Sequence, residues 1–175
     1  LAGDPAVPGA ATRYPSSTAD PFGAPDGLHF DSAGLLWIQT DMSGQLMHKG
    51  DMARLGNNQM LCADVSTGRI KRFMTGPRGC EITGCVVTPD RRTLFVNIQH
   101  PGETRDEGGA EGHWPDGGTT RPRSATAVVR RRERGSIMAD PAAPPWMRYA
   151  LATLAAALYA VAKPGNTFPH YVLLL

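Results

Sequence analysis

The sequence is poor in cysteine, the residue that defines many small secreted and metal-binding domains. It has only three cysteines in 175 residues, Cys62, Cys80 and Cys85, so they cannot all pair with one another. Four residues separate Cys80 from Cys85, which matches no zinc-knuckle spacing. We therefore expect packing residues or unpaired thiols here, with a thiol facing a metal as the alternative.

The chain also lacks a strong excess of one charge and a long apolar run. Its formal net charge is +2, so nothing in the charge balance calls for a nucleic-acid partner. The longest apolar stretch, residues 149–162, has 14 residues, whereas a bilayer span needs about 20. We therefore expect no nucleic-acid partner and no stable membrane span.

Common catalytic fingerprints are absent as well. The sequence contains no Gly-x-Ser-x-Gly elbow, Walker loop, Rossmann glycine fingerprint or His-Glu-x-x-His motif. No convincing Ser/His/Asp set can be assembled from the sequence either. Any chemistry must therefore be inferred from the fold and from scattered polar residues.

Glycine and proline, in contrast, are abundant. With 20 Gly and 15 Pro they make up a fifth of the chain, against about 12% in an average protein. This excess fits many turns between short strands and argues against a helical bundle.

A strand–turn–strand pattern occurs twice in the chain. Residues 25–41 alternate in polarity on either side of the turn Asp31–Gly34, which has Asp first and Gly last as a type I turn prefers. A weaker copy covers residues 84–96, with Gly84 in the place of Gly27. A hairpin that recurs at such a distance is typical of a β-propeller, and residues 25–74 contain about four strands, enough for one blade.

The fold class that we predict is all-β, a partial β-propeller with about two blades. A complete propeller needs at least four blades of roughly 40–50 residues, so we expect this chain to be a piece of a longer protein. We divide it into an irregular lead-in (1–21), propeller blades (22–130) and a tail (131–175). The tail changes composition and combines a low-complexity linker with a helix-prone apolar run over 149–162.

Acidic residues precede the first strand of each expected blade. Asp26 comes directly before Gly27, and Glu81 lies three residues before Gly84. In a propeller such positions converge on one end of the central channel, so the two acids could share a site. Asn57 and Asn58, in a loop between strands, could add carbonyl oxygens, and oxygen ligands suit hard cations such as Ca²⁺. For Asp26 the alternative is a plain turn role, because Pro-Asp-Gly is itself a turn signal.

Three further polar residues lie at strand ends or in loops. Asp41 follows the second strand and either faces the channel rim or simply solvates the strand end. His100, at a strand exit, is the best placed of the histidines for function. Arg78 is a candidate clamp for phosphate or carboxylate, since guanidinium binds these groups through two parallel hydrogen bonds; surface solvation is its alternative.

Several sequence blocks within residues 22–130 resemble the C-terminal part of the PhoX-type alkaline phosphatases. The more specific blocks lie towards the C-terminal side, and Pro-Asp-Gly-Leu alone also resembles gluconolactonase-type propellers. The similar blocks are residues 25–28, 36–41, 56–60, 76–84, 95–103, 113–115 and 121–126.

This resemblance implies a propeller of six blades, of which about two are expected here. It implies hydrolysis of small phosphomonoesters at a centre of Ca²⁺ and Fe³⁺ ions, and twin-arginine export to the periplasm or the cell exterior. By motif, it implies metal-site roles for Asp26, Asp41, Glu81 and Asn58. The family's cysteine ligand has no counterpart here, and residues 131–175 do not resemble the family. We therefore expect the isolated chain to be inactive.

Two other functions stay open at the level of the sequence. A calcium-dependent lactonase-like propeller is supported by the Pro-Asp-Gly hairpin, but not by the blocks at 56–60 and 95–103. A non-catalytic propeller used for binding is the other.

Overall fold

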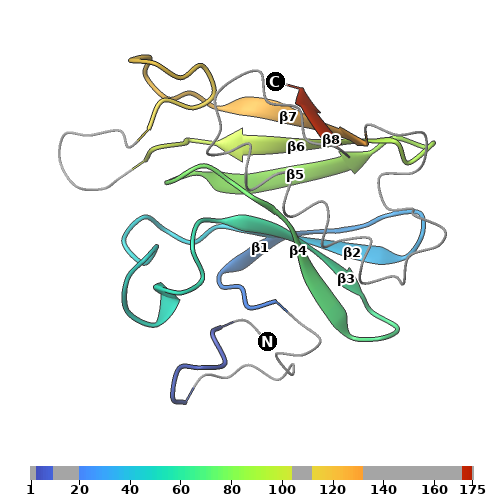
Figure 1. Cartoon of the computed structure of the whole chain (residues 1–175). Helices are drawn as coiled ribbons and strands as arrows, with labels where there is room; N and C mark the ends of the chain where they lie inside the picture. The colour runs from blue at the N-terminus through green and yellow to red at the C-terminus, as the bar shows by residue number, and fades with distance from the viewer. Residues whose placement is uncertain (1–2, 10–19, 104–111, 132–170, 175) are drawn as a thin grey trace.

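The computed structural model describes residues 3–9, 20–103, 112–131 and 171–174, and these form two antiparallel four-stranded sheets packed against each other (Figure 1). The described part is almost entirely β, with one 3-10 turn, η1 (Gly50–Met52). The helix-prone run 149–162 lies outside the described residues. Among the residues that the structure describes, no helix is long and apolar enough to cross a membrane.

The first sheet is an up-and-down meander of four strands in sequence order, β1 (Pro25–Phe30), β2 (Leu35–Thr40), β3 (Gln59–Asp64) and β4 (Arg69–Thr75). These are the four strands expected within 25–74. The turn after β1 forms as predicted, because the Asp31 carboxylate accepts hydrogen bonds from the backbone N–H groups of Ala33 and Leu35.

The second sheet repeats this order with β5 (Glu81–Val87), β6 (Thr93–Gln99), β7 (Ala125–Arg131) and β8 (Tyr171–Leu174). Its first hairpin is the predicted copy of the β1–β2 hairpin. Both inner strands carry a register shift at the repeated glycine, between Pro25 and Leu28 in β1 and between Thr83 and Cys85 in β5. The two sheets therefore look like two blades of a propeller.

Strand β8 was not predicted. It pairs with β7 through residues 128–131 and completes the second sheet with a segment of the tail. Without β8, the outer edge of β7 would present unpaired backbone N–H and C=O groups, and a short extended segment is enough to satisfy them. The tail therefore contributes at least these four residues to a sheet.

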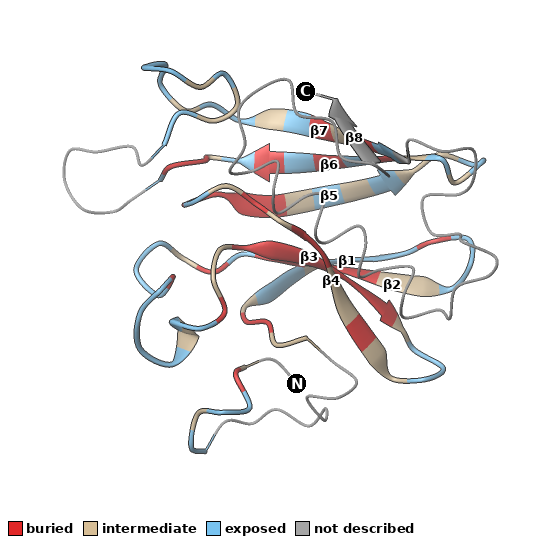
Figure 2. Ribbon diagram, in the orientation of Figure 1, coloured by how far each residue is buried: buried red, intermediate tan, exposed pale blue. Residues whose placement is uncertain are grey.

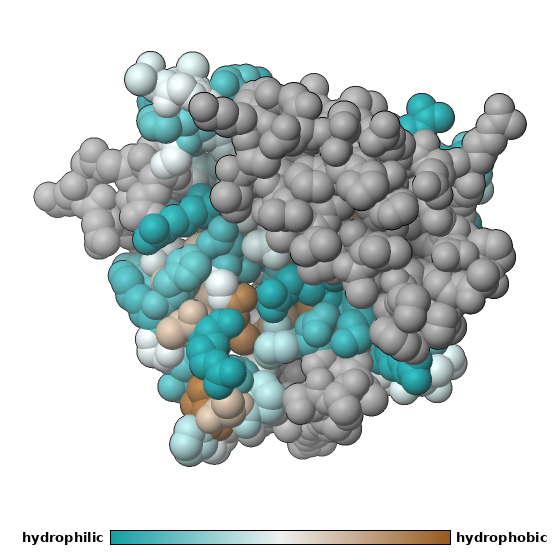
Figure 3. Space-filling view, in the orientation of Figure 1, coloured by the Kyte–Doolittle hydropathy of each residue, from teal (hydrophilic) through white to brown (hydrophobic). Residues whose placement is uncertain are grey.

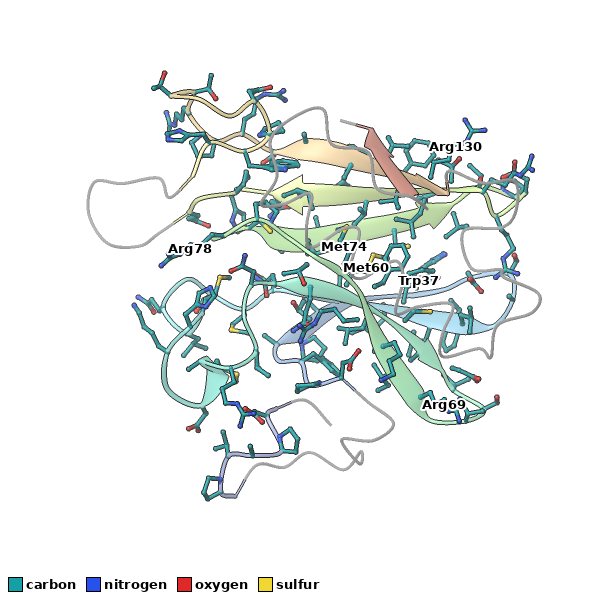
Figure 4. The ribbon with its side chains drawn as sticks, viewed as in Figure 1. Trp37, Met60, Arg69, Met74, Arg78 and Arg130 are labelled. Carbon is teal, nitrogen blue, oxygen red and sulfur yellow. The ribbon has the colours of Figure 1, made fainter. Side chains whose placement is uncertain are left out.

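The main core lies between the two sheets, where the buried residues in Figure 2 are concentrated. Trp37, Met60 and Met74 of the first sheet point into this layer in Figure 4. They form one apolar cluster with Ile82 and Val96 of the second sheet. All five side chains are almost completely excluded from water. Because apolar burial is the main stabilising term in folding, this layer holds the two sheets in one arrangement.

The three cysteines belong to this core, and none of them is in a disulfide. Cys62 and Cys80 are buried in the apolar cluster, and Cys85 packs against it. Burial raises the pKa of the Cys85 thiol to about 12, so it is not a thiolate at neutral pH. All three are therefore packing residues, as expected from the sequence.

A second apolar cluster covers the other face of the first sheet. Phe22, from the segment before β1, packs there against Ile38, Leu61 and Ile70. The lead-in is also tied to the sheet by the hydrogen bond from the Asp20 N–H to the Ile70 carbonyl of β4. In the space-filling view of Figure 3, most described residues on the visible face are hydrophilic, with a few apolar side chains at the lower left.

Candidate metal centre

Three strand ends meet at one end of the two sheets, on the left in Figure 1. Asp41 follows β2, Glu81 begins β5, and His100 follows β6. One donor atom from each residue lies within 4.8 Å of the others, which is close enough for a single cation to touch all three. Antiparallel pairing of β5 with β6 places Glu81 beside Gln99, and so next to His100.

Glu81 is the most enclosed member of this group. The residue is 9% exposed, and its Oε2 accepts a hydrogen bond from Gln99 Nε2 at 2.9 Å. The same oxygen lies 3.3 Å from His100 Nε2. Since a buried carboxylate is costly without a partner, these contacts, or a cation, are needed to stabilise its charge.

His100 lies between two carboxylates. Its Nε2 faces Glu81, and its Nδ1 lies 2.8 Å from Oε2 of the more exposed Glu103. A neutral imidazole has a single N–H, and a carboxylate can only accept, so at most one of these contacts is a hydrogen bond. The other ring nitrogen carries a lone pair, which a carboxylate oxygen repels and a cation can accept. The backbone φ of His100 is +35°, unusual for a residue with a side chain, so the turn holds this histidine in a strained conformation.

Asn58 is buried next to the site, with 1% of the residue exposed. Its Oδ1 accepts hydrogen bonds from Thr40 Oγ1 and the Met42 N–H, and its Nδ2 donates to the Met42 and Cys80 carbonyls. An amide side chain offers two donor hydrogens and two acceptor lone pairs, so all four are used within the protein. In this arrangement Asn58 has no lone pair left for an ion.

The loop before Glu81 is fixed against the turn after His100. The Gly102 N–H donates to the Arg78 carbonyl at 2.8 Å. Gly79 has φ +70°, and a Cβ there would come within 2.8 Å of the backbone N and O of Glu103. Only glycine fits this approach, which places Glu81 and His100 on two segments in direct contact.

We expect Gly79→Ala to cost about 2–3 kcal/mol of unfolding free energy, because both its φ and its contact with Glu103 are incompatible with a side chain. The matched control is Gly34→Ala. Gly34 has nearly the same φ, +77°, but open space around its Cβ position, so it should lose only about 1 kcal/mol. Urea denaturation of both proteins measures the difference. Equal losses would show that the loop does not depend on this close approach.

The other residues predicted from the sequence lie outside the three-residue group. Asp26 is an exposed residue of β1. Arg78 is exposed in the loop between β4 and β5 and lies at the same end of the sheets as the group (Figure 4). The structure thus brings Asp41 and Glu81 together with His100. Asn58 is hydrogen-bonded to the backbone next to both acids.

The sequence had indicated His100 only as a well-placed histidine, and Gln99 and Glu103 not at all. The signal for all three was available, because the segment Gln99–Glu103 follows the second strand of a hairpin whose first strand begins at Glu81. What the sequence did not contain was the register that pairs Gln99 with Glu81.

Comparisons with known proteins give a consistent result. The family model for alkaline phosphatase PhoX matches residues 1–102. Among solved structures, the chain is similar to Pseudomonas fluorescens PhoX in complex with vanadate, a transition state analogue, with 53% sequence identity and a TM-score of 0.53. That match covers 61% of this chain and 17% of the relative, so the chain spans about a sixth of the relative's length. No curated protein matches the chain.

The matched stretch begins earlier and ends earlier than the 22–130 expected from the sequence. It includes the lead-in, whose Asp20 N–H donates to the Ile70 carbonyl of the first sheet, and it ends two residues after His100. Asp41, Glu81 and His100 all lie inside it. More than half of the sequence, including the whole three-residue group, thus follows the family pattern, and the chain belongs to the PhoX family of alkaline phosphatases.

Proposed function

We propose that this chain supplies part of the metal centre of a phosphatase that hydrolyses phosphate monoesters. The observation that carries the proposal is the convergence of Asp41, Glu81 and His100, with donor atoms within 4.8 Å of one another. Carboxylate oxygens suit hard cations such as Ca²⁺, and an imidazole next to them also suits iron. The group therefore fits the Ca²⁺ and Fe³⁺ that the family resemblance implies.

In this proposal some residues bind the cation and others orient its ligands. Asp41 and Glu81 would hold it through oxygen, and His100 through Nε2, with Glu103 orienting the ring from Nδ1. A bound metal ion polarises a phosphoryl group and stabilises the charge that develops during transfer. In this proposal Arg78, exposed at the same end of the sheets, binds phosphate oxygens, while Asp26 and Asn58 are not ligands.

The larger context of the site is also part of the proposal. The whole protein would act on small phosphomonoesters in the periplasm or outside the cell, with residues 22–130 forming propeller blades. Since the chain spans 17% of its solved relative, further ligands would come from the rest of the protein.

We expect Asp41→Asn to weaken Ca²⁺ binding by at least about tenfold, because it removes a charged ligand from the group. Isothermal titration of CaCl₂ into residues 1–175 measures this. Asp51→Asn is the matched control, since Asp51 is an exposed acid in η1 and should leave the affinity unchanged.

With Ca²⁺ and iron added, the same chain should hydrolyse p-nitrophenyl phosphate no faster than its Glu81→Ala variant. An Asp41→Asn protein that binds Ca²⁺ as tightly as the wild type would contradict the proposed site. Hydrolysis above the Glu81→Ala level would contradict the expectation that the chain is inactive alone.

A further inference from the structure

We infer that Asn58 is a positioning residue, whose side-chain amide fixes the backbone next to Asp41 relative to the backbone next to Glu81. The two carboxylates then face a common cation. The metal-binding part of this inference rests on the proposed function. The backbone part does not.

The Asn58 amide forms hydrogen bonds with the residues directly before and after Asp41 in the sequence. Asn58 Oδ1 accepts from Thr40 Oγ1 at 2.8 Å and from the Met42 N–H at 2.6 Å, while Nδ2 donates to the Met42 carbonyl at 2.9 Å. Thr40 and Met42 are the immediate neighbours of Asp41. These three hydrogen bonds hold the residues on either side of Asp41, and the Asp41 N–H itself donates to the Ala24 carbonyl at 2.9 Å.

The fourth hydrogen bond reaches the other sheet. Asn58 Nδ2 donates to the Cys80 carbonyl at 2.8 Å, and Cys80 directly precedes Glu81. One buried amide thus connects the end of β2 in the first sheet with the start of β5 in the second. Because these contacts are shielded from water, losing them would leave buried polar groups unpaired.

Asn58 contacts the segments that carry the metal ligands, and in this arrangement it does not itself face the ion. Asp41 and Glu81 have carboxylate oxygens available to a cation, whereas every hydrogen-bonding position of the Asn58 amide is already occupied. Residues that orient metal ligands in this way commonly affect metal affinity by about 10- to 100-fold. We assign this role to Asn58.

Asn58→Asp separates a positioning role from a ligand role, because the two predict opposite results. An aspartate ligand in place of an amide would bind Ca²⁺ more tightly. If Asn58 is a positioning residue, the Asn58→Asp protein would instead bind Ca²⁺ less well. The reason is that a carboxylate has no N–H to donate to the Met42 and Cys80 carbonyls. We expect the Ca²⁺ affinity of residues 1–175, measured by calorimetry, to fall by about 10- to 100-fold.

Asn57→Asp is the matched control, since it adds the same charge one residue away. Asn57 bonds to the Gly76 carbonyl and to His48, and not to the neighbours of Asp41 or Glu81. Its Ca²⁺ affinity should stay within about threefold of the wild type. A second control, Ile70→Ala, removes packing in the separate apolar cluster on the other face of the first sheet. If it lowers stability as much as Asn58→Asp but leaves Ca²⁺ affinity unchanged, general destabilisation is not the cause.

Amide hydrogen exchange of Met42 tests the backbone part without any metal. Its N–H donates to Asn58 Oδ1, and in Asn58→Ala it should exchange about tenfold faster than in Asn57→Ala. Tighter or unchanged Ca²⁺ binding by Asn58→Asp, or unchanged Met42 exchange in Asn58→Ala, would overturn the inference. If Glu81→Gln leaves Ca²⁺ binding unaffected, the proposed function fails instead, and the exchange measurement still decides the role of Asn58.

Discussion

The Glu81→Gln protein is expected to bind Ca²⁺ about 100-fold more weakly than the wild type, the largest binding effect of any single substitution proposed. Glu81 is the most buried donor in the site, so its charge interacts with a cation in a medium of low dielectric. Two unit charges 4 Å apart at an effective dielectric of about 20 interact by about 4 kcal/mol, and each 1.4 kcal/mol is a factor of ten. Desolvation of the ion offsets part of this gain.

The same substitution should leave the metal-free fold nearly intact. Glutamine has the shape of glutamate, and its carbonyl oxygen can still accept the hydrogen bond from Gln99 Nε2. In a thermal melt we therefore expect the wild type to gain stability on adding Ca²⁺, by about 2.7 kcal/mol at a concentration of 100 Kd, and Glu81→Gln to gain much less. Asp90→Asn, an exposed acid in the β5–β6 turn, is the charge-matched control and should keep the full gain. A full gain in Glu81→Gln would show that the cation binds elsewhere.

The Trp37→Ala protein is expected to lose about 3–5 kcal/mol of unfolding free energy, the largest stability effect. Trp37 is 0% exposed and lies in the layer between the sheets, where its ring meets Phe73 edge to face at a centroid distance of 4.9 Å. Its indole N–H also donates to the Asp31 carboxylate at 3.3 Å. The substitution therefore opens a cavity and leaves a buried carboxylate with one partner fewer.

For a domain of this size such a loss lowers the melting temperature by about 10 °C or more, which circular dichroism can follow. Trp37→Phe keeps most of the packing but loses the donor to Asp31, so its loss should be smaller. Leu46→Ala, at a residue that is 52% exposed, should change stability by no more than about 0.5 kcal/mol. A Trp37→Ala protein that melts within about 2 °C of the wild type would show that this layer does not hold the sheets together.

The strands from β1 to β7 could be predicted because each is marked by local chemistry. Alternating polarity identifies the β1–β2 and β5–β6 hairpins, and Asp31 and Gly34 mark the first turn. Strand β8 has no such mark, since a four-residue apolar segment far along the chain gives no sign of the edge that it will pair with. The Gly27–Gly84 correspondence was a correct indication of repetition, because both glycines occupy register shifts in equivalent strands.

The site was predictable only in part, for reasons of register and of hydrogen-bond geometry. The acids Asp41 and Glu81 could be picked out because strand ends of neighbouring blades converge. The group contains Asp41, which follows β2, and does not contain Asp26, which lies within β1. The role of Asn58 depends on four partners from separate segments, and no local pattern in the sequence encodes them.

The most direct test of the central claim is a crystal structure of residues 1–175 grown with CaCl₂. We predict an ion bound by carboxylate oxygens of both Asp41 and Glu81 at about 2.3–2.6 Å, next to the His100 ring, with Asn58 still bonded to Met42 and Cys80. Asp41 and Glu81 found without an ion between them, at a Ca²⁺ concentration that saturates binding in solution, would contradict the account.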